Sequence, residues 1–507
     1  MSERRSFSLG EAIDRAISPF APVTAAKRTA ARIGLQAVRQ YEAASHGRRT
    51  AGWRRPATSA DAENAWAART LRFSARDLER NNKYAASMIR QFAATAWADG
   101  IAPQFHHKAK TVRQKAQDSW DRWAESKVDG QDDFYGVGKP LTRRLVTDGE
   151  ALIGWRADKD GPDGRIRGME ADYLDDSRLS EATTDGGRIV QGVQTDASGD
   201  RSAYWLFDHH PGDILLPSSR QSMPVPAEHI DHVYERLRFD QARGVSWFAP
   251  LALTLRDIGD IEDAVRLQRK VQACLAMIIT PGDGNAASPL TSEQHDQAEG
   301  KPSLENMRPG MVVRLKPGET ASSVIPTSTG DGVDFIRQQL AAVCANMVPY
   351  YLATGDTIGA TYTSLRAANL GSHALLDDVQ KNVLIPRYVR PAIDRRIRRA
   401  VLETGDRRLL DCGISYALPI RRVVDPVKDL MAELIEIRAG LKTLSKALAE
   451  RGLNPEEHLR SIAEMNDLID LLKLALDSDP RRLTDAGVLQ LAAAAGGIAA
   501  GATTSAN

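Results

Sequence analysis

The stretch that decides the fold spans residues 225–279 and reads VPAEHIDHVYERLRFDQARGVSWFAPLALTLRDIGDIEDAVRLQRKVQACLAMII. It begins as a strand with alternating polar and apolar residues. An arginine-rich turn follows, containing Arg238, Gln241, Arg243, Gly244 and Val245. The turn leads into a predicted helix from Pro250 to Ile279, which would be about 45 Å long at 1.5 Å per residue. A strand is therefore joined through a polar turn to an unusually long helix.

One face of this predicted helix is apolar and another is acidic. The apolar stripe contains Leu251, Leu255, Ile258, Ile261, Val265 and Val271. Asp257, Asp260 and Asp263 follow one another at steps of three along a different face. The pattern predicts that the apolar face packs on the protein and that the acidic face does not.

The segments before this stretch change period. Residues 61–97 show helical spacing of apolar residues up to Asp99-Gly100, and a second helix is predicted from Lys108 through Trp123. Residues 149–233 instead hold short alternating segments separated by turn sequences such as DKDGPDG and TTDGG, which are typical of a β-rich domain. The first 60 residues carry eleven basic and four acidic side chains and are predicted to form a flexible arm.

The segments after it predict a small module held between two long helices. Residues 280–334 contain PGDG, RPG and KPG with short strand-like runs, and residues 333–347 form a second amphipathic helix. A loop rich in Gly and Thr then opens a further helix, in which Pro386 and Pro391 predict a kink. A strand near ISYALPIRRV and a final helical block complete the chain, so the fold class is α+β.

Composition limits the function without defining it. The chain has 507 residues with 67 Lys+Arg against 66 Asp+Glu, so any contact with nucleic acid must be local. Its length suggests roughly three or four domains. Its three cysteines are widely spaced in apolar segments and are predicted to be reduced packing residues: Cys274, Cys344 and Cys412. No secretion signal or membrane-spanning segment is predicted.

Three segments in order resemble one known family. These are the stretch 225–279, GVQTDASGDRSAYWLFDHHPGD at 192–213, and TYTSLRAANL at 361–370. Together they resemble the portal proteins of lambda-like tailed phages over most of residues 60–425. The resemblance implies a portal fold with an α/β wing, long stem helices, a small α/β clip insertion and a helical C-terminal crown, assembled into a dodecameric ring.

The resemblance also implies where these parts lie. The expected parts are a basic flexible arm (1–60), a wing of helices and β-rich sequence (61–249), a first stem helix (250–280), a clip (281–332), a second stem helix (333–353), a tunnel loop (354–363), a kinked helix with a strand returning to the wing (364–425), a crown (426–488) and a disordered tail (489–507).

The resemblance assigns the channel contact to the tunnel loop. Its residues are Thr354, Gly355, Asp356, Thr357, Ile358, Gly359, Ala360, Thr361 and Tyr362. The loop has no basic residue before Arg366, so DNA would be held only lightly as it passes. The stem aspartates Asp257, Asp260 and Asp263 would line the channel too, or would lie on an outer face paired with neighbouring arginines.

A dense basic patch follows the loop. Six arginines lie close together in a predicted helix: Arg387, Arg390, Arg395, Arg396, Arg398 and Arg399. We expect them to contact a neighbouring subunit, with DNA phosphates and bulk solvent as the alternatives.

The function implied is that of a non-enzymatic portal subunit, through which DNA is packaged into and ejected from a capsid. Expected partners are double-stranded DNA, the terminase large subunit, the major capsid or scaffolding protein and neck proteins. No cofactor, metal or membrane is expected, and the protein would reside at the portal vertex of the virion after assembly in the host cytoplasm. The sequence has no P-loop, so the packaging motor must be another protein.

Two other functions remain open. A metal-dependent enzyme of nucleic-acid metabolism could use the pairs His209-His210 and His229/His232 with acidic residues near Asp172, Asp175 and Asp176. With ten histidines in the chain, such spacings arise by chance. A generic helical scaffold protein is the third possibility.

Overall fold

The computed structural model describes most of the chain from residue 57 onward. The described residues are 57–158, 161–213, 221–274, 277–279, 312–314, 331–421, 426–451, 453 and 455–474. Those from Ala60 onward belong to one compact unit. Nearly all of the predicted arm, most of the predicted clip and the predicted tail therefore lie outside the described residues.

The first helical stretch is two helices and not one. α3 (Ala60–Asn81) and α4 (Lys83–Ala96) are separated at Asn82, whose side chain accepts hydrogen bonds from the backbone amides of Tyr84 and Ala85. Apolar periodicity continues across the break, which is why it predicted a single helix. Asparagine is a strong N-cap residue, and here its cap ends one helix and starts the next.

An aromatic core joins helices that are distant in sequence. α5 (Lys110–Ala124) and α6 (Phe134–Thr147) bring Trp120 and Phe134 together, and Phe134 stacks on Tyr388 with ring centroids 4.6 Å apart. Trp97, which directly follows α4, contacts the rings of Phe134 and Tyr388. Burial of large rings in such edge and stacked arrangements contributes strongly to a core. α6 was not predicted, because its sequence FYGVGKPLTRRLVT combines two glycines with a proline.

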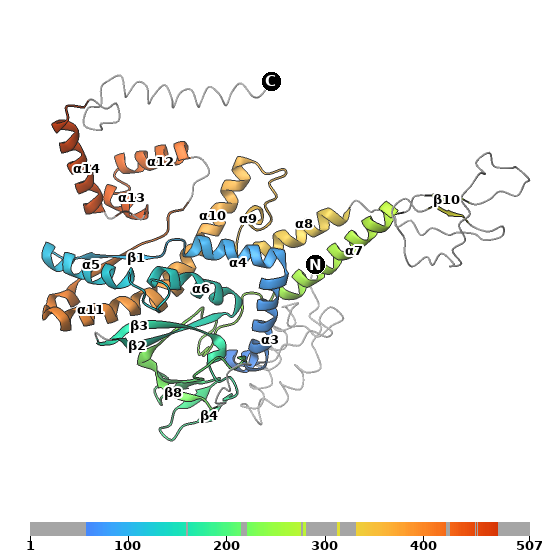
Figure 1. The fold of residues 1–507 in the computed structure, drawn as a ribbon, viewed down its shortest axis with the longest axis horizontal. Coiled ribbons are helices and arrows are strands. Elements are labelled where there is room, and N and C mark those ends of the chain that lie inside the picture. The colour runs from blue at the N-terminus through green and yellow to red at the C-terminus, as the bar shows by residue number, and fades with distance from the viewer. Residues whose placement is uncertain are drawn as a thin grey trace, which may run out of the picture. The chain divides into compact units, whose positions relative to one another are not determined.

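The β-rich region predicted for residues 149–233 is confirmed as two antiparallel sheets (Figure 1). The three-stranded sheet has the order β3-β2-β9, and the five-stranded sheet has the order β4-β5-β6-β7-β8. Their strands are β2 (Glu150–Asp158), β3 (Gly161–Glu170), β9 (Ile230–Tyr234), β4 (Glu181–Ala182), β5 (Arg188–Val190), β6 (Val193–Thr195), β7 (Arg201–Leu206) and β8 (Met223–Pro226). Short 3₁₀ turns, η3 (Ala171–Tyr173) and η4 (Ala227–His229), follow β3 and β8.

Two long helices lie side by side and antiparallel, and they project from the part of the protein that holds the sheets (Figure 1). α7 (Ala252–Cys274) is shorter than predicted, because Pro250 lies in the preceding turn and Met277–Ile279 form strand β10. β10 pairs in parallel with β11 (Val312–Arg314). α8 (Asp331–Cys344) returns the chain to the body of the protein. The predicted pair of helices flanking an insertion is therefore present.

The predicted kink after the loop is a change of helix type. α9 (Tyr350–Thr354) is followed by α10 (Tyr362–Val379), by a π-helical segment η5 (Gln380–Val389) that contains Pro386, and by α11 (Arg390–Thr404). Proline removes a backbone donor, and the wider π turn accommodates this loss. A 3₁₀ turn η6 (Arg407–Asp411) then leads to β12 (Gly413–Ala417), which pairs antiparallel with β1 (Ala102–His106).

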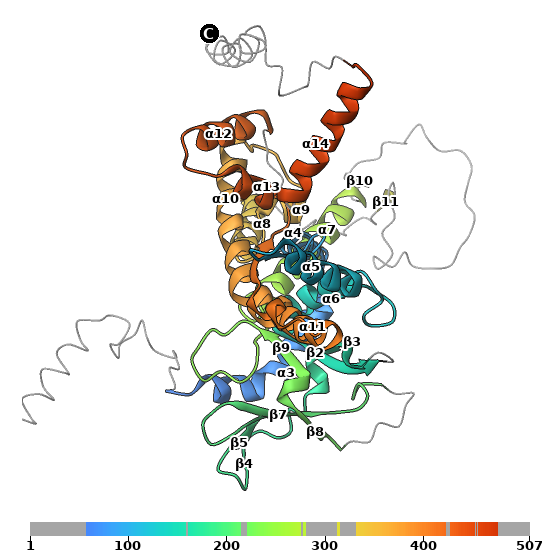
Figure 2. The same cartoon turned by 90° about the vertical axis from the view of Figure 1, so that its left-hand side faces the viewer.

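The last described part of the chain is a set of three helices, the first of which lies next to α10 (Figure 2). These are α12 (Pro426–Arg438), α13 (Leu444–Glu450) and α14 (Pro455–Leu471). Asp429 of α12 pairs with Arg366 of α10 at 3.3 Å. Within the described residues no helix is both long and apolar enough to cross a membrane.

Candidate functional site

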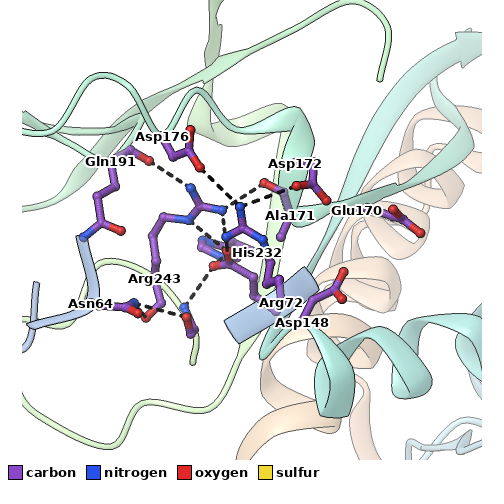
Figure 3. Close-up of polar contacts among 12 residues, drawn as sticks. Asn64, Arg72, Asp148, Glu170, Ala171, Asp172, Asp176, Gln191, His232 and Arg243 are labelled. Atoms are coloured by element: carbon purple, nitrogen blue, oxygen red, sulfur yellow. Dashed lines mark hydrogen bonds and ion pairs between the residues drawn. The ribbon is translucent and has the colours of Figure 1, made fainter. Parts of the chain in front are cut away.

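A buried network of charges fixes the turn that leads into α7 (Figure 3). Arg243 is 1% exposed, and its Nε donates a hydrogen bond of 2.8 Å to Oε1 of Glu150, the first residue of β2. The same guanidinium donates to the carbonyls of Ala171 and Gln191 at 2.9 and 3.3 Å. Because a guanidinium offers five donors in one plane, a single arginine ties the turn to β2, η3 and the loop after β5.

The second oxygen of Glu150 completes the network. Oε2 accepts hydrogen bonds from the backbone amide of Gly244 at 2.9 Å and from Nε2 of His232 at 2.8 Å. Burial alone would raise the pKa of Glu150, but the charge of Arg243 and the hydrogen bonds from His232 and Arg243 lower it instead. Glu150 is therefore an anion held inside the protein by full pairing.

His232 in this network is neutral. Its Nδ1 lies 2.7 Å from a guanidinium nitrogen of Arg201, which can only donate, so Nδ1 must accept. The proton is then on Nε2, which donates to Glu150. Burial and the neighbouring arginine lower the pKa of His232 to about 4. This histidine is a structural hydrogen-bonding group in β9 and carries no charge at neutral pH.

Two glycines permit the close approach of the turn to the sheet. Gly149 has a φ of +85°, and a Cβ added there would lie 2.2 Å from the carbonyl carbon of Val245. A Cβ on Gly244 would lie 2.1 Å from the carbonyl oxygen of Gly149. Asn64 of α3 bonds to the carbonyl of Gly244 at 3.2 Å. The arginine-rich turn that contains Arg243 and Gly244 is thus held against α3 and β2, and it determines where α7 begins.

A second set of charges next to this network contains two residues of the enzyme alternative, Asp172 and His210. One oxygen each of Glu170 and Asp172 and a ring nitrogen of His210 lie within 4.8 Å of one another, close enough to hold a metal ion. A nitrogen of Arg76, however, lies 3.1 Å from Glu170, 2.5 Å from Asp172 and 2.6 Å from Asp148. Arg72 also lies 3.5 Å from Asp172, and Arg144 lies 3.8 Å from Glu170, so both carboxylates of the trio are already paired with cationic side chains.

The histidine pairs of the enzyme alternative have separate partners. His209 lies beside Asp208, His229 beside Glu228, and His232 bonds to Glu150. Asp175 accepts hydrogen bonds from Ser177 and Ser222, and Asp176 pairs with Arg72 at 3.3 Å. Within the described residues these groups are not part of the cluster that contains Asp172 and His210.

The predicted tunnel loop is shorter than its assigned bounds and is anchored at its base. Thr354 ends α9 and Tyr362 begins α10, so the loop itself is residues 355–361. Asp356 pairs with Arg337 of α8 at 2.9 Å and accepts a hydrogen bond from the backbone amide of Ile358 at 3.0 Å. That backbone bond, together with Tyr350 and Arg337, lowers the pKa of Asp356.

The tip of this loop points away from the packed core. Ile358 is 82% exposed, and Gly355 and Gly359 have φ values of +73° and +76° with open space where a Cβ would be. Thr361 caps α10 through a capping box with Ser364. The loop is therefore an exposed turn with two fixed ends. The role of Arg337 was not predicted, because Arg337 lies in α8, 19 residues before its partner Asp356 in the loop.

The stem aspartates lie on the exposed side of α7. Leu255 and Ile258 are buried, whereas Asp257, Asp260 and Asp263 are all exposed. Asp263 pairs with Arg266 at 2.5 Å. Asp257 and Asp260 make no ion pair within the described part of the chain. The buried end of the predicted apolar stripe is confirmed, but Val265 farther along is exposed and does not continue it.

Most of the arginine patch is engaged within the chain. Arg395 pairs with Asp231 at 2.8 Å, and Arg399 lies 3.4 Å from Asp158. Arg387 lies over the ring of Tyr234, with 4.0 Å from its guanidinium carbon to the ring centroid. Arg390 pairs with Asp394, and Arg396 pairs with Glu403. Arg398 is exposed and has no partner among the described residues. The patch holds α11 on the sheet, and its contact with a subunit or DNA stays a prediction.

Comparison with known proteins extends these observations. The family described as phage portal protein, lambda family, matches residues 46–380. The chain is 22% identical over 423 residues to a probable portal protein of Halomonas phage phiHAP-1, covering 78% of this chain and 79% of that protein. It is also 22% identical over 468 residues to the portal protein of Escherichia phage N15, covering 80% and 85% respectively.

Solved structures give a weaker match. A chain from the neck of a native gene transfer agent particle, computed with C12 symmetry, aligns with a TM-score of 0.41 at 13% identity, covering 76% of this chain and 94% of that one. The match to the portal-protein family is independent of these structures, and it covers more than half of the sequence. The chain belongs to the lambda family of phage portal proteins, and its function is that of a portal protein at the head-tail connector.

Proposed function

We propose that copies of this chain assemble into a dodecameric ring whose axial channel conducts the phage genome during packaging and ejection. The observation that carries this proposal is the unit formed by α7, α8 and the loop 355–361. The two helices run side by side, and the loop is fixed to α8 by the pair Arg337–Asp356 with Ile358 exposed at its tip. Repeated around an axis, this unit would place the helices as the stem and the loops at the channel.

The charge of the loop supports loose contact with DNA. Its single acidic residue, Asp356, is neutralised by Arg337, and the exposed tip carries Ile358 between small and hydroxyl residues. A duplex carries one negative charge per about 1.7 Å of its axis, so a ring of cations would bind it and slow its passage. A nearly neutral loop would guide DNA without holding it.

The parts of the chain take their roles from this arrangement. Residues 61–249 would form the wing, α7 and α8 the stem, residues 281–332 the clip and residues 426–488 the crown. The clip would meet the terminase large subunit, the wing the major capsid or scaffolding protein, and neck proteins would dock after packaging. The ring would occupy the portal vertex of the virion, having assembled in the host cytoplasm.

A charge placed at the loop tip tests the channel assignment. Ile358→Lys would add one cation per subunit at a position where the side chain is 82% exposed. We expect the ring to assemble normally but to package DNA more slowly in a terminase-driven assay, with the rate recovering as salt is raised.

The matched control is Ile420→Lys, which adds the same charge at another exposed isoleucine, 63% accessible and outside the loop. It should package at the wild-type rate. If the two variants package equally well, the loop does not contact the DNA and its assignment is wrong.

A further inference from the structure

A pocket of about 900 Å³ lies between the end of α5, the β2–β3 hairpin and α11. These three elements lie next to one another at one side of the fold (Figure 1). The pocket is lined by five cationic and two acidic side chains: Arg122, Lys127, Arg165, Arg396, Arg399, Asp158 and Glu403. Neither the enzyme alternative nor the proposed channel uses this pocket.

The inner wall of the pocket is rigid. Arg396 is 9% exposed, donates to the carbonyl of Ser119 at 3.1 Å and lies 3.3 Å from Glu403. Arg399 bonds to Glu403 at 2.9 Å and lies 3.4 Å from Asp158. Both carboxylates of the pocket are therefore already paired with arginines of α11. A wall whose side chains are held in place loses little entropy when a ligand binds.

The floor of the pocket is aromatic and fixed. Trp123 donates its indole N–H to the carbonyl of Gly164 at 2.9 Å and stacks on Trp155 with ring centroids 5.7 Å apart. Arg395 of α11 lies over Trp155, with 4.9 Å from its guanidinium carbon to the ring centroid. These contacts join α5, the hairpin and α11, so packed elements fix the position of Trp123 in the pocket.

Three further cations that line the pocket have no anionic partner among the described residues. Arg122, Lys127 and Arg165 are exposed, and none makes an ion pair within the described part of the chain. With the two wall carboxylates already paired, these three charges form an unbalanced positive surface around a concave site. Burial and the neighbouring charges of Arg399 and Arg122 also lower the pKa of Arg396, as expected where cations are crowded.

We propose that this basic pocket binds an acidic peptide segment of a partner protein, with the partner's carboxylates paired to Arg122, Lys127 and Arg165. Guanidinium groups bind carboxylates in a bidentate geometry, and the volume falls within the roughly 300–1,000 Å³ typical of ligand pockets. A DNA duplex is too wide to enter such a pocket, and its fixed phosphates would face Asp158 and Glu403. A flexible chain can place its carboxylates on the three unpaired cations and avoid both. This inference goes beyond the channel and stands without it.

Binding of a fluorescein-labelled hexaglutamate peptide to the full-length protein, measured by fluorescence anisotropy, tests the proposal. We expect saturable binding that the triple variant Arg122→Glu, Lys127→Glu, Arg165→Glu weakens at least tenfold. The matched control is Arg90→Glu, Lys139→Glu, Arg188→Glu, which makes the same change in net charge at exposed cations outside the pocket. The control should weaken binding less than threefold.

All six substituted side chains are exposed, so both variants should keep the thermal midpoint of the wild type. If the pocket variant is nevertheless unstable, Lys127→Glu alone should still weaken binding more than Lys139→Glu alone. Absence of binding to the wild type, or equal losses in the two triple variants, would overturn the proposal. Tighter binding of a 20-base-pair duplex that depends on the same three residues would overturn it in favour of nucleic acid.

Discussion

At the scale of single residues, the protein depends on charges that are fully paired inside it. Glu150 is fully buried and accepts hydrogen bonds from Arg243, Gly244 and His232. A buried ion pair of this kind contributes little net stability compared with apolar residues, but loss of one partner leaves the other uncompensated. The main effect of the network is therefore to fix the position of the turn that leads into α7.

Loss of Arg243 should be severe. Arg243→Leu leaves the carboxylate of Glu150 buried without its main partner, and we expect the free energy of unfolding to fall by about 3–5 kcal/mol. Arg238→Leu is the control, because Arg238 pairs with Glu63 on the surface, where both side chains are 50% exposed. Surface pairs contribute about 0–1 kcal/mol. Equal losses of thermal midpoint in the two variants would contradict the role given to the network.

The neutral state of His232 predicts a pH dependence of stability. Its pKa of about 4 in the folded protein lies below the ordinary value of 6.5, so the unfolded chain binds the proton first as pH falls. Stability from this residue is present above pH 6.5 and is lost as pH falls from 6.5 towards 4.

His232→Gln should flatten this part of the profile of thermal midpoint against pH, since Gln can accept and donate in the same positions but does not titrate. His209→Gln is the control at an exposed histidine. An unchanged profile in His232→Gln would show that His232 is not the titrating group. The variant should lose neither bound metal nor any hydrolytic activity, in keeping with a structural role.

At the scale of elements, the sequence predicted helices and strands that follow from the local pattern of apolar residues. It did not predict features that depend on partners distant in sequence. The β-rich region, the two long helices and the kink at Pro386 were all predicted from local pattern. The break at Asn82 was missed because a cap does not alter the apolar period, and helix α6 was missed because its two glycines and its proline disfavour a helix. Glu150 and Arg337 were missed for a different reason. Each acts through a partner that another element supplies, and sequence spacing does not reveal such a partner.

Release of the loop from α8 tests the anchoring of this element. Arg337→Ala removes the ion pair with Asp356, so the turn that Asp356 stabilises through the amide of Ile358 should open more often. We expect the amides of Ile358 and Ala360 to exchange hydrogen several-fold faster, measured by mass spectrometry. Arg366→Ala, which removes a pair with Asp429 in α12, should leave these amides unchanged.

The acidic face of α7 distinguishes a channel from an outer surface. Asp257, Asp260 and Asp263 are exposed, and a Debye length of about 8 Å at physiological salt would let a duplex in the channel feel them. If they line the channel, changing all three to Lys should make the ring bind DNA tightly and stall packaging, with relief by added salt. Normal packaging combined with poor ring assembly would instead place this face against a neighbouring subunit.

At the scale of the whole molecule, the single chain leaves many large apolar side chains exposed. They include Leu253 and Leu267 on α7 and Ile462, Met465 and Leu471 on α14. Exposed apolar area on this scale is typical of surfaces that other subunits cover. A ring would bury these faces, and a stable interface commonly removes about 1,600 Å² from solvent. Family membership and these exposed apolar side chains thus both support the proposed ring.

Negative-stain electron microscopy of the purified full-length protein at low concentration and moderate salt tests this conclusion most directly. The account predicts closed rings with an axial hole, far larger than a single chain of 55.4 kDa. Fields that contain only particles of the size of one chain, without rings, would contradict it.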